Sequence, residues 1–192
     1  MTPRARPMTP EDRREALVDA TIPLLHEHGR GVTTKLIADA AGVAEGTIFR
    51  VFESKDELVT AALEKALDLD PFLADLESVD LDRPLRERLV DLCSRLQERF
   101  RGIFSLMTAM GMVGPPKSHR QMEEGRRRAE KAMIAVVEPD ADRLTCTPDQ
   151  LVHMLRMLTF SGTHPHISDG HLLTPDQIVD TLLDGVLRKK DS

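Results

Sequence analysis

Apolar residues recur every three or four positions along most of the chain, a spacing that places them on one face of a helix. Threonine, serine and proline mark where such segments begin, and glycine or proline marks where they end. The pattern predicts an all-α protein of about nine helices. The predicted helices include residues 9–29, 33–41, 44–52, 54–70, 84–107, 118–137, 147–160 and 174–187, with an acidic connection at 70–83.

Residues 33–58 combine two short apolar helices with a tight turn between them. The small side chain of Ala38 allows the two helices to cross closely, and Gly42 can adopt the left-handed conformation that ends the first helix. Ile48 and Phe52 give the second helix its own apolar face. This order of features is typical of a helix-turn-helix, whose second helix lies in the major groove of DNA.

Residues 12–65 resemble the DNA-binding domain of the TetR family of transcriptional regulators. The matching residues are Thr33-Thr34, Ile37-Ala38, Ala41-Gly42-Val43, Gly46-Thr47-Ile48-Phe49, Phe52 and Ser54-Lys55-Asp56-Glu57-Leu58. The resemblance implies a dimeric regulator with a three-helix DNA-binding head and a C-terminal helical bundle for ligand binding and dimerisation. We therefore expect a flexible arm at residues 1–8, a helix-turn-helix domain at 9–54 and a regulatory and dimerisation domain at 55–192.

Several side chains of the helix-turn-helix have the chemistry to contact DNA. Arg50 can form a bidentate pair with guanine, and Gly46 lets the backbone approach the groove closely. Glu45 either accepts a hydrogen bond from cytosine or is an acid favoured by the helix dipole. Lys55 lies at a helix N-terminus, where a phosphate would explain a cation. Phe49 stands where TetR-family proteins often carry a tyrosine that contacts a phosphate, so we expect it to pack on a sugar. The residues expected at the DNA are Thr33, Thr34, Lys35, Ala44, Glu45, Gly46, Thr47, Phe49, Arg50 and Lys55.

The C-terminal part is rich in flexible apolar side chains, which form either an ordinary core or the lining of a cavity for an apolar ligand. The resemblance implies that some of them bind a small effector. The candidates are Phe100, Phe104, Met107, Met110, Met133, Met154, Met157 and Phe160. The resemblance to the TetR family also implies that the last two helices pair with those of a second copy, so that the dimer binds a near-palindromic operator. The candidate dimer residues are Leu151, Leu155, Leu158, Ile178, Leu182 and Val186.

The net charge of −6 opposes binding to nucleic acid unless cations gather locally. The first 60 residues carry eight Lys and Arg against ten Asp and Glu, so their balance is also acidic. The cations expected to supply a basic surface are Arg4, Arg6, Lys35, Arg50 and Lys55.

No apolar run approaches the ~18 residues of a membrane span, and two widely separated cysteines fit a reducing compartment. We expect a cytoplasmic protein with no membrane partner.

Two other functions are compatible with the sequence. The segment that holds His164, His166, Asp169 and His171 is either a polar loop or the ligand set of a metal-sensing regulator. The chain could instead be a helical ligand-binding or interaction protein whose DNA-binding head is vestigial. An enzyme is not expected, because the sequence has no P-loop, dinucleotide fingerprint or nucleophile elbow, and no cofactor is implied.

Overall fold

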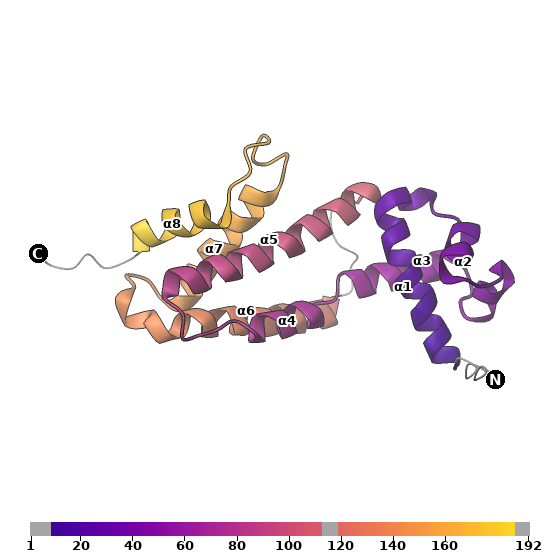
Figure 1. Cartoon of the computed structure of the whole chain (residues 1–192), viewed down its shortest axis with the longest axis horizontal. Coiled ribbons are helices and arrows are strands. Elements are labelled where there is room, and N and C mark those ends of the chain that lie inside the picture. Colours follow the sequence, from indigo (N-terminus) through magenta and orange to yellow (C-terminus); the bar gives the residue numbers. More distant parts are fainter. Residues whose placement is uncertain (1–8, 113–118, 187–192) are drawn as a thin grey trace, which may run out of the picture. The chain divides into compact units, whose positions relative to one another are not determined.

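The computed structural model describes residues 9–112 and 119–186, and within them every regular element is a helix (Figure 1). This confirms the all-α class. The eight α-helices are α1 (Pro10–His28), α2 (Thr34–Ala41), α3 (Lys55–Ala66), α4 (Asp70–Glu77), α5 (Leu85–Ala109), α6 (His119–Val137), α7 (Pro148–Thr163) and α8 (Pro175–Val186). Three short 3₁₀-helices join them, η1 (Gly29–Gly31), η2 (Glu45–Arg50) and η3 (Glu138–Arg143). The expected number of helices was about nine.

The predicted helix starts are confirmed by their capping bonds. Thr9 and Asp12 form a reciprocal capping box at α1, and Thr147 and Gln150 form another at α7. At α3 the hydroxyl of Ser54 accepts a hydrogen bond from the backbone N–H of Glu57. These bonds satisfy N–H groups that the first turn of a helix leaves without intrahelical partners.

The prediction for residues 54–83 is wrong in detail. The helix that begins after Ser54 ends at Ala66, and the segment expected to be a connection contains α4. Pro71 lies in the first turn of α4, where its missing N–H costs nothing, so it begins a helix rather than ending one. Phe72, Leu73 and Leu76 are buried by this helix, which explains why the acidic segment folds.

The chain divides into two compact units. The described residues of the first, the head unit, are 9–67 and 105–112, and those of the second, the body unit, are 68–104 and 119–186. This division differs from the boundary expected after Ser54, because α3 packs against α1 and so belongs with the head. The expected arm at residues 1–8 lies outside the described residues.

The head unit is a three-helix fold that also includes the last turn of α5. Helix α1 packs against α2 and α3. Leu106 in the last turn of α5 and Met110, the residue after its end, are buried in the same core as residues of α1, α2 and α3. Polar bonds hold the same segment, since the Nε of Arg30 donates to the carbonyl of Met110 over 2.7 Å.

Gly29 allows the end of α5 to approach the end of α1. Its φ is +52°, and a Cβ atom placed on it would lie 1.9 Å from the carbonyl oxygen of Ala109. No side chain fits there, because real Cβ atoms do not approach a carbonyl oxygen so closely. Backbone contact at Gly29 therefore fixes how residues 105–112 close the head unit.

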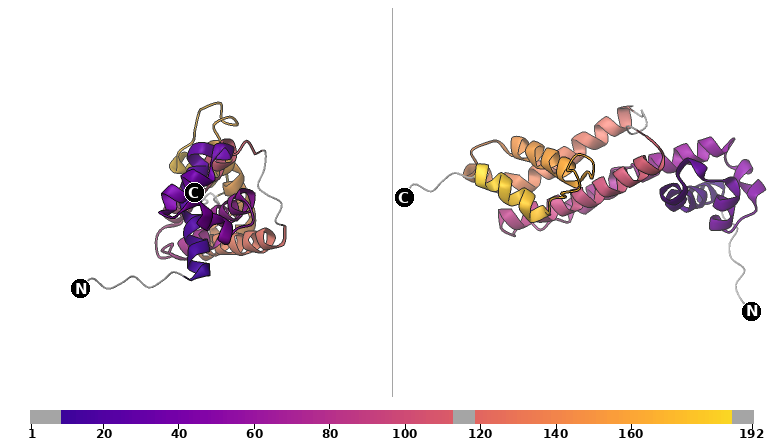
Figure 2. Two further views of the ribbon diagram at one scale, coloured as in Figure 1. Left: turned by 90° about the vertical axis from the view of Figure 1, so that its right-hand side faces the viewer. Right: turned by 90° about the horizontal axis from the view of Figure 1, so that it is seen from above.

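In the body unit, α4 packs on α6, α6 packs on α7, and α7 packs on α8. The orange α7 and the yellow α8 are seen next to each other in the right-hand view of Figure 2. The core is lined by apolar side chains from α4 to α8, among them Leu73, Leu89, Leu92, Met133, Leu151, Leu155, Ile178 and Val179. A charged pair lies within this core. The guanidinium of Arg88, a side chain that is 2% exposed, pairs with the carboxylate of Asp140 and donates to the carbonyl of Val136.

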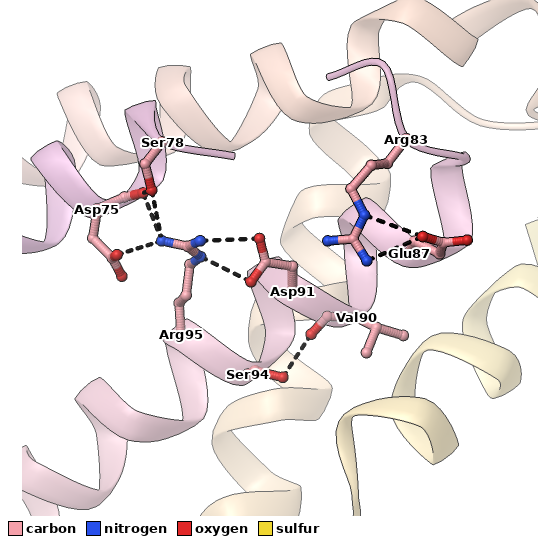
Figure 3. A network of polar contacts seen from close by, with 8 residues as sticks. All are labelled: Asp75, Ser78, Arg83, Glu87, Val90, Asp91, Ser94 and Arg95. Atoms are coloured by element: carbon pink, nitrogen blue, oxygen red, sulfur yellow. Dashed lines mark hydrogen bonds and ion pairs between the residues drawn. The ribbon is translucent and has the colours of Figure 1, made fainter. Parts of the chain in front are cut away.

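A network around Arg95 holds α4 against α5 (Figure 3). Its guanidinium makes two 3.0 Å bonds to the carboxylate of Asp91 and one of 2.7 Å to the carbonyl of Asp75. The same group donates to the hydroxyl of Ser78 over 3.0 Å. Hydrogen bonds to Asp91 are the largest cause of the raised pKa of Arg95. Arg95 therefore ties the end of α4, next to the loop that follows it, to the middle of α5.

Candidate functional site

The turn of the helix-turn-helix has the predicted geometry. Gly42 ends α2 in the left-handed conformation, with φ 67° and ψ 31°. The N–H of Val43 then donates to the carbonyl of Ala38 over 3.0 Å, which satisfies one of the last carbonyls of α2. Ile37 and Ile48 are fully buried, so both elements press their apolar faces into the head core.

The second element of the motif is shorter and tighter than predicted. Residues expected as an α-helix at 44–52 form the 3₁₀-helix η2, Glu45–Arg50. Three residues complete one turn of a 3₁₀-helix, so Gly46 lies in line with Phe49, and Thr47 with Arg50. The predicted face of Gly46, Thr47 and Arg50, which assumed α-helical spacing, is corrected to these two rows. Phe49, 54% exposed, and Arg50 both point away from the core.

The predicted DNA-contacting residues gather on α2, η2 and the start of α3. Most are exposed, and Thr34, Thr47 and Lys55 are half-buried. The hydroxyl of Thr33 caps α2 by accepting from the N–H of Leu36 over 3.2 Å. The hydroxyl of Thr34 donates to the carboxylate of Glu45, which links α2 to η2. No sequence rule predicts that bond, because its partners are 11 positions apart and approach only through the turn.

Lys55 has a structural partner that the sequence did not reveal. Its Nζ donates to the carbonyl of Val32 over 3.2 Å, which joins the start of α3 to the segment before α2. The prediction explained this cation at a helix N-terminus by a phosphate. The carbonyl already accounts for part of that placement, since it accepts one of the three N–H bonds of the ammonium group.

The cations at this surface are few. Lys35 and Arg50 are exposed, whereas Arg14 lies 4.2 Å above the ring of Phe52 and pairs with Glu57. Arg4 and Arg6, expected to add charge, lie outside the described residues. The described basic surface of the motif is therefore small, which predicts a weak dependence of DNA affinity on salt for each head.

The eight candidate effector residues do not form one group. Met110 is buried in the head core and Met133 in the body core, while Met157 is 57% exposed. Met107 belongs to the head unit, and Met154 lies at the edge of the body core. The structure brings together only the three phenylalanines.

Phe100, Phe104 and Phe160 form an aromatic cluster between α5 and α7. Phe100 and Phe104 are stacked with ring centroids 5.9 Å apart, and Phe160 meets them edge-on at 5.4 and 5.1 Å. The ring of His164 lies 4.5 Å from that of Phe104 and closes one side of the cluster. Within the described residues, the buried Oγ1 of Thr163 and Nδ1 of His164 have no hydrogen-bond partner. The sequence analysis considered His164 only as a possible metal ligand and did not single out Thr163, because the burial of these two polar atoms depends on packing.

The predicted dimer residues mostly serve the core of their own chain. Leu151, Leu155 and Ile178 have no exposed surface, and Val186 is 8% exposed, because α7 and α8 pack on each other. Leu158 and Leu182 remain partly exposed at the edge of that core. In this conformation Leu151, Leu155 and Ile178 offer no surface to a second copy, and Val186 offers very little. The large exposed apolar side chains of α7 and the following loop are Met157, Phe160, Ile167 and Leu172.

The histidine segment gives no support to the metal-sensing alternative. Across residues 9–112 and 119–186, no three His, Cys, Asp or Glu side chains are placed to hold a metal ion. His164 instead packs against Phe104, and His166 lies beside it with ring centroids 5.8 Å apart. In the same part of the chain, no helix has the length and apolarity needed to cross a membrane.

Sequence comparison places the head unit among known regulators. The sequence model of "Bacterial regulatory proteins, tetR family" matches residues 17–62. An uncharacterized HTH-type transcriptional regulator of Mycobacterium tuberculosis is 27% identical over 105 residues, 51% of this chain and 45% of that protein. YvkB of Bacillus subtilis, also described as an uncharacterized HTH-type transcriptional regulator, is 46% identical over 59 residues, 30% of each chain. The chain thus spans less than half the length of these curated relatives.

Similarity to solved structures extends over most of the chain. A TetR-family transcriptional regulator from Streptomyces coelicolor matches 92% of this chain and 80% of its own, with a TM-score of 0.62 and 20% identity. SmeT, the repressor of the Stenotrophomonas maltophilia multidrug efflux pump SmeDEF, matches with a TM-score of 0.56 and 22% identity, over 91% of this chain and 90% of SmeT. These likenesses establish a shared fold, and the helix-turn-helix match identifies its head. The head of this chain thus matches the TetR family of bacterial regulatory proteins, and the HTH-type relatives and the shared fold support a TetR family regulator.

Proposed function

We propose that this protein is a dimeric, sequence-specific DNA-binding repressor of transcription, released from its operator by a small apolar effector. The observation that carries the proposal is the intact helix-turn-helix with Arg50 exposed on η2 beside the open backbone of Gly46. A side chain added at Gly46 would meet nothing within 4 Å, so the backbone of η2 at Gly46 is free to approach a groove. Such a regulator works where chromosomal DNA is, in the cytoplasm.

The repressor role is supported by analogy with SmeT. That protein is a repressor of an efflux pump and also has a solved complex with triclosan, which matches this chain with a TM-score of 0.58. Release follows if the effector binds better to a conformation that is unsuited to DNA, since the loss of DNA affinity equals the difference between the two binding free energies.

The aromatic cluster is the proposed effector site. Three phenylalanine rings supply apolar contact, and Thr163 and His164 supply two buried polar atoms beside them. A buried polar atom without a partner costs about 1–3 kcal/mol, which a bound ligand recovers by completing the hydrogen bond. The fitting ligand has an aromatic or apolar body and one group that can donate or accept a hydrogen bond.

The proposed dimer uses the surface of α7 and α8 that remains outside the core of one chain. Leu158 and Leu182 are partly exposed there, and Met157 adds a flexible apolar side chain. A two-fold pairing through these helices places two reading elements on one duplex, which requires a near-palindromic operator.

Selection of bound duplexes from a random-sequence library by the purified protein, at about 0.1 M salt, tests the proposed function. We expect a near-palindromic sequence to be enriched, because two related heads read two half-sites. Absence of enrichment by the folded protein, both alone and with a compound shown to bind it, would leave a ligand-binding protein with a vestigial head.

Arg50→Ala is expected to weaken binding to the selected operator by about 1–3 kcal/mol and to relax base preference in each half-site. The matched variant is Lys35→Ala, which removes an exposed cation from α2 without touching η2. Lys35→Ala is expected to weaken binding to operator and to random DNA by the same factor, because a phosphate contact carries no sequence information. Titration of both variants on both duplexes checks this. Equal losses on the two duplexes for Arg50→Ala would remove its reading role.

Thr163→Val is expected to weaken effector binding by about fivefold or more, through loss of one hydrogen bond. The same change should not lower the melting temperature of the ligand-free protein, because valine has the shape of threonine and leaves no unpaired hydroxyl in the core. Calorimetric titration of apolar aromatic compounds, with triclosan as the first, checks both statements. Thr181→Val, an exposed position on α8, is the control. Unchanged affinity in Thr163→Val would place the effector elsewhere.

A further inference from the structure

We propose that Glu45 suppresses binding to non-operator DNA by holding the hydroxyl of Thr34, and that it releases this hydroxyl only on a duplex that offers an amino group to its carboxylate. Glu45 would then help to determine which DNA sequences the protein binds, a role that the residue type alone does not predict. The inference rests on the proposed function, since it concerns the same DNA interface.

The starting point is the bond between the two elements of the motif. Thr34 is the first residue of α2 and Glu45 the first of η2, and the Thr34 hydroxyl donates to the Glu45 carboxylate. Glu45 is exposed and Thr34 half-buried, so the bond lies at the surface of the head unit. A threonine hydroxyl has one proton, and in the free protein that proton is committed to Glu45.

A DNA phosphate would compete with Glu45 for that proton. The first N–H groups of α2 have no intrahelical partners, and the partial positive charge of a helix N-terminus favours an anion. Lys35, the next residue, is exposed and adds a full positive charge. A phosphate that approaches these groups also approaches the Glu45 carboxylate. Two unit charges of one sign about 4 Å apart repel by ~1 kcal/mol in water and ~4 kcal/mol at a protein surface.

The repulsion is relieved only if the carboxylate turns toward a hydrogen-bond donor. In the major groove such donors are the amino groups of cytosine and adenine. A duplex with one of these bases at the right position accepts Glu45 and frees Thr34 for the phosphate, whereas other duplexes meet both the repulsion and an occupied hydroxyl. Glu45 therefore lowers affinity for random DNA more than affinity for the operator, which widens the gap between correct and incorrect partners.

Glu45→Gln is the test, because glutamine can still accept from the Thr34 hydroxyl but carries no charge. We expect its affinity for a random-sequence duplex to rise by about tenfold and its affinity for the selected operator to change by less than about threefold. Two effects contribute to the rise, since one charge repulsion is removed and a neutral amide holds the Thr34 hydroxyl less strongly than a carboxylate does. Asp39→Asn is the matched control, since it removes one exposed carboxylate from α2 at a position away from this bond. It should shift both affinities by one common factor.

Two further measurements separate this role from a structural one. The melting temperature of Glu45→Gln should equal that of the wild type, because the bond to Thr34 is retained. In a Thr34→Val background, Glu45→Gln should raise affinity for random DNA by clearly less than tenfold, since the hydroxyl for which the two anions compete is gone and only the charge repulsion is left to relieve. The inference would be overturned if Glu45→Gln changed the affinities for operator and random DNA by the same factor. It would also be overturned if the effects of Glu45→Gln and Thr34→Val on the free energy of binding to random DNA were strictly additive.

The outcomes distinguish this inference from the proposed function. If the wild type selects a near-palindrome and Glu45→Gln leaves the ratio of operator to random affinity unchanged, only the role of Glu45 fails. If the folded wild type selects no sequence under any condition, the proposed function fails and the inference falls with it.

Discussion

Gly29→Ala is expected to lower the free energy of unfolding of the head unit by about 4 kcal/mol, the sum of a strained backbone and a steric overlap worth ~1–3 kcal/mol each. With φ at +52° and ψ at −131°, Gly29 occupies a conformation that residues with a Cβ atom rarely adopt. The added methyl group would also lie 1.9 Å from the carbonyl oxygen of Ala109. The backbone at the end of α5 would have to move away from α1.

The measurement is thermal unfolding followed by far-UV circular dichroism, read at the transition of the head unit. Gly31→Ala is a close control, because Gly31 lies in the same 3₁₀ turn, has ordinary φ and would meet nothing within 4 Å. We expect this control to melt within a few degrees of the wild type, as is usual for a surface substitution. If Gly29→Ala had the same melting temperature as Gly31→Ala, the close approach of α1 and α5 would not contribute to stability.

Asp140→Ala is expected to destabilise the body unit by about 3–5 kcal/mol, because it leaves the charge of Arg88 unpaired in the core. The Arg88 side chain is 2% exposed, and apart from Asp140 its guanidinium donates to the carbonyl of Val136. Its Nε is buried and has no partner within the described residues, so the group is already incompletely satisfied. Removing the carboxylate leaves one carbonyl to compensate a buried cation.

Urea titration of Asp140→Ala and of Asp142→Ala checks this prediction. Asp142 lies on the same 3₁₀-helix, η3, but is exposed, so its loss should cost less than about 0.5 kcal/mol. The combination of Asp140→Ala with Arg88→Met should recover much of the loss, because an apolar side chain of similar length removes the buried charge. Equal stability of Asp140→Ala and Asp142→Ala would mean that Arg88 finds another partner or water.

Local signals carried much of the sequence prediction. The threonines at 9 and 147 cap their helices as expected, and Gly42 adopts the left-handed conformation, because each of these features depends only on neighbouring residues. The all-α class followed from the same periodicity. Pro71 was misread because proline fits both the first turn of a helix and the segment after one. The burial of Phe72 and Leu73, which decides between them, is a tertiary fact.

The candidate sites were predictable to different degrees. The helix-turn-helix segment could be located, since its residues are contiguous and its turn has a fixed pattern. The bond between Thr34 and Glu45 and the carbonyl partner of Lys55 could not, because both join residues brought together by folding. The apolar stripes of α7 and α8 indicate burial but not whether the covering surface belongs to the same chain. Leu151 and Ile178 are covered by their own chain.

Because Leu106 and Met110 complete the head core, the order in which the chain is synthesised sets when that core can form. Helices α1, α2 and α3 leave the ribosome first, but their last core partners follow only after α4 and nearly all of α5. Until then the nascent head exposes the apolar surface that these two side chains will cover, which is a state prone to aggregation. A fragment that ends at Leu67 would remain permanently in this condition, so an isolated head needs residues 105–112 joined to it by a linker.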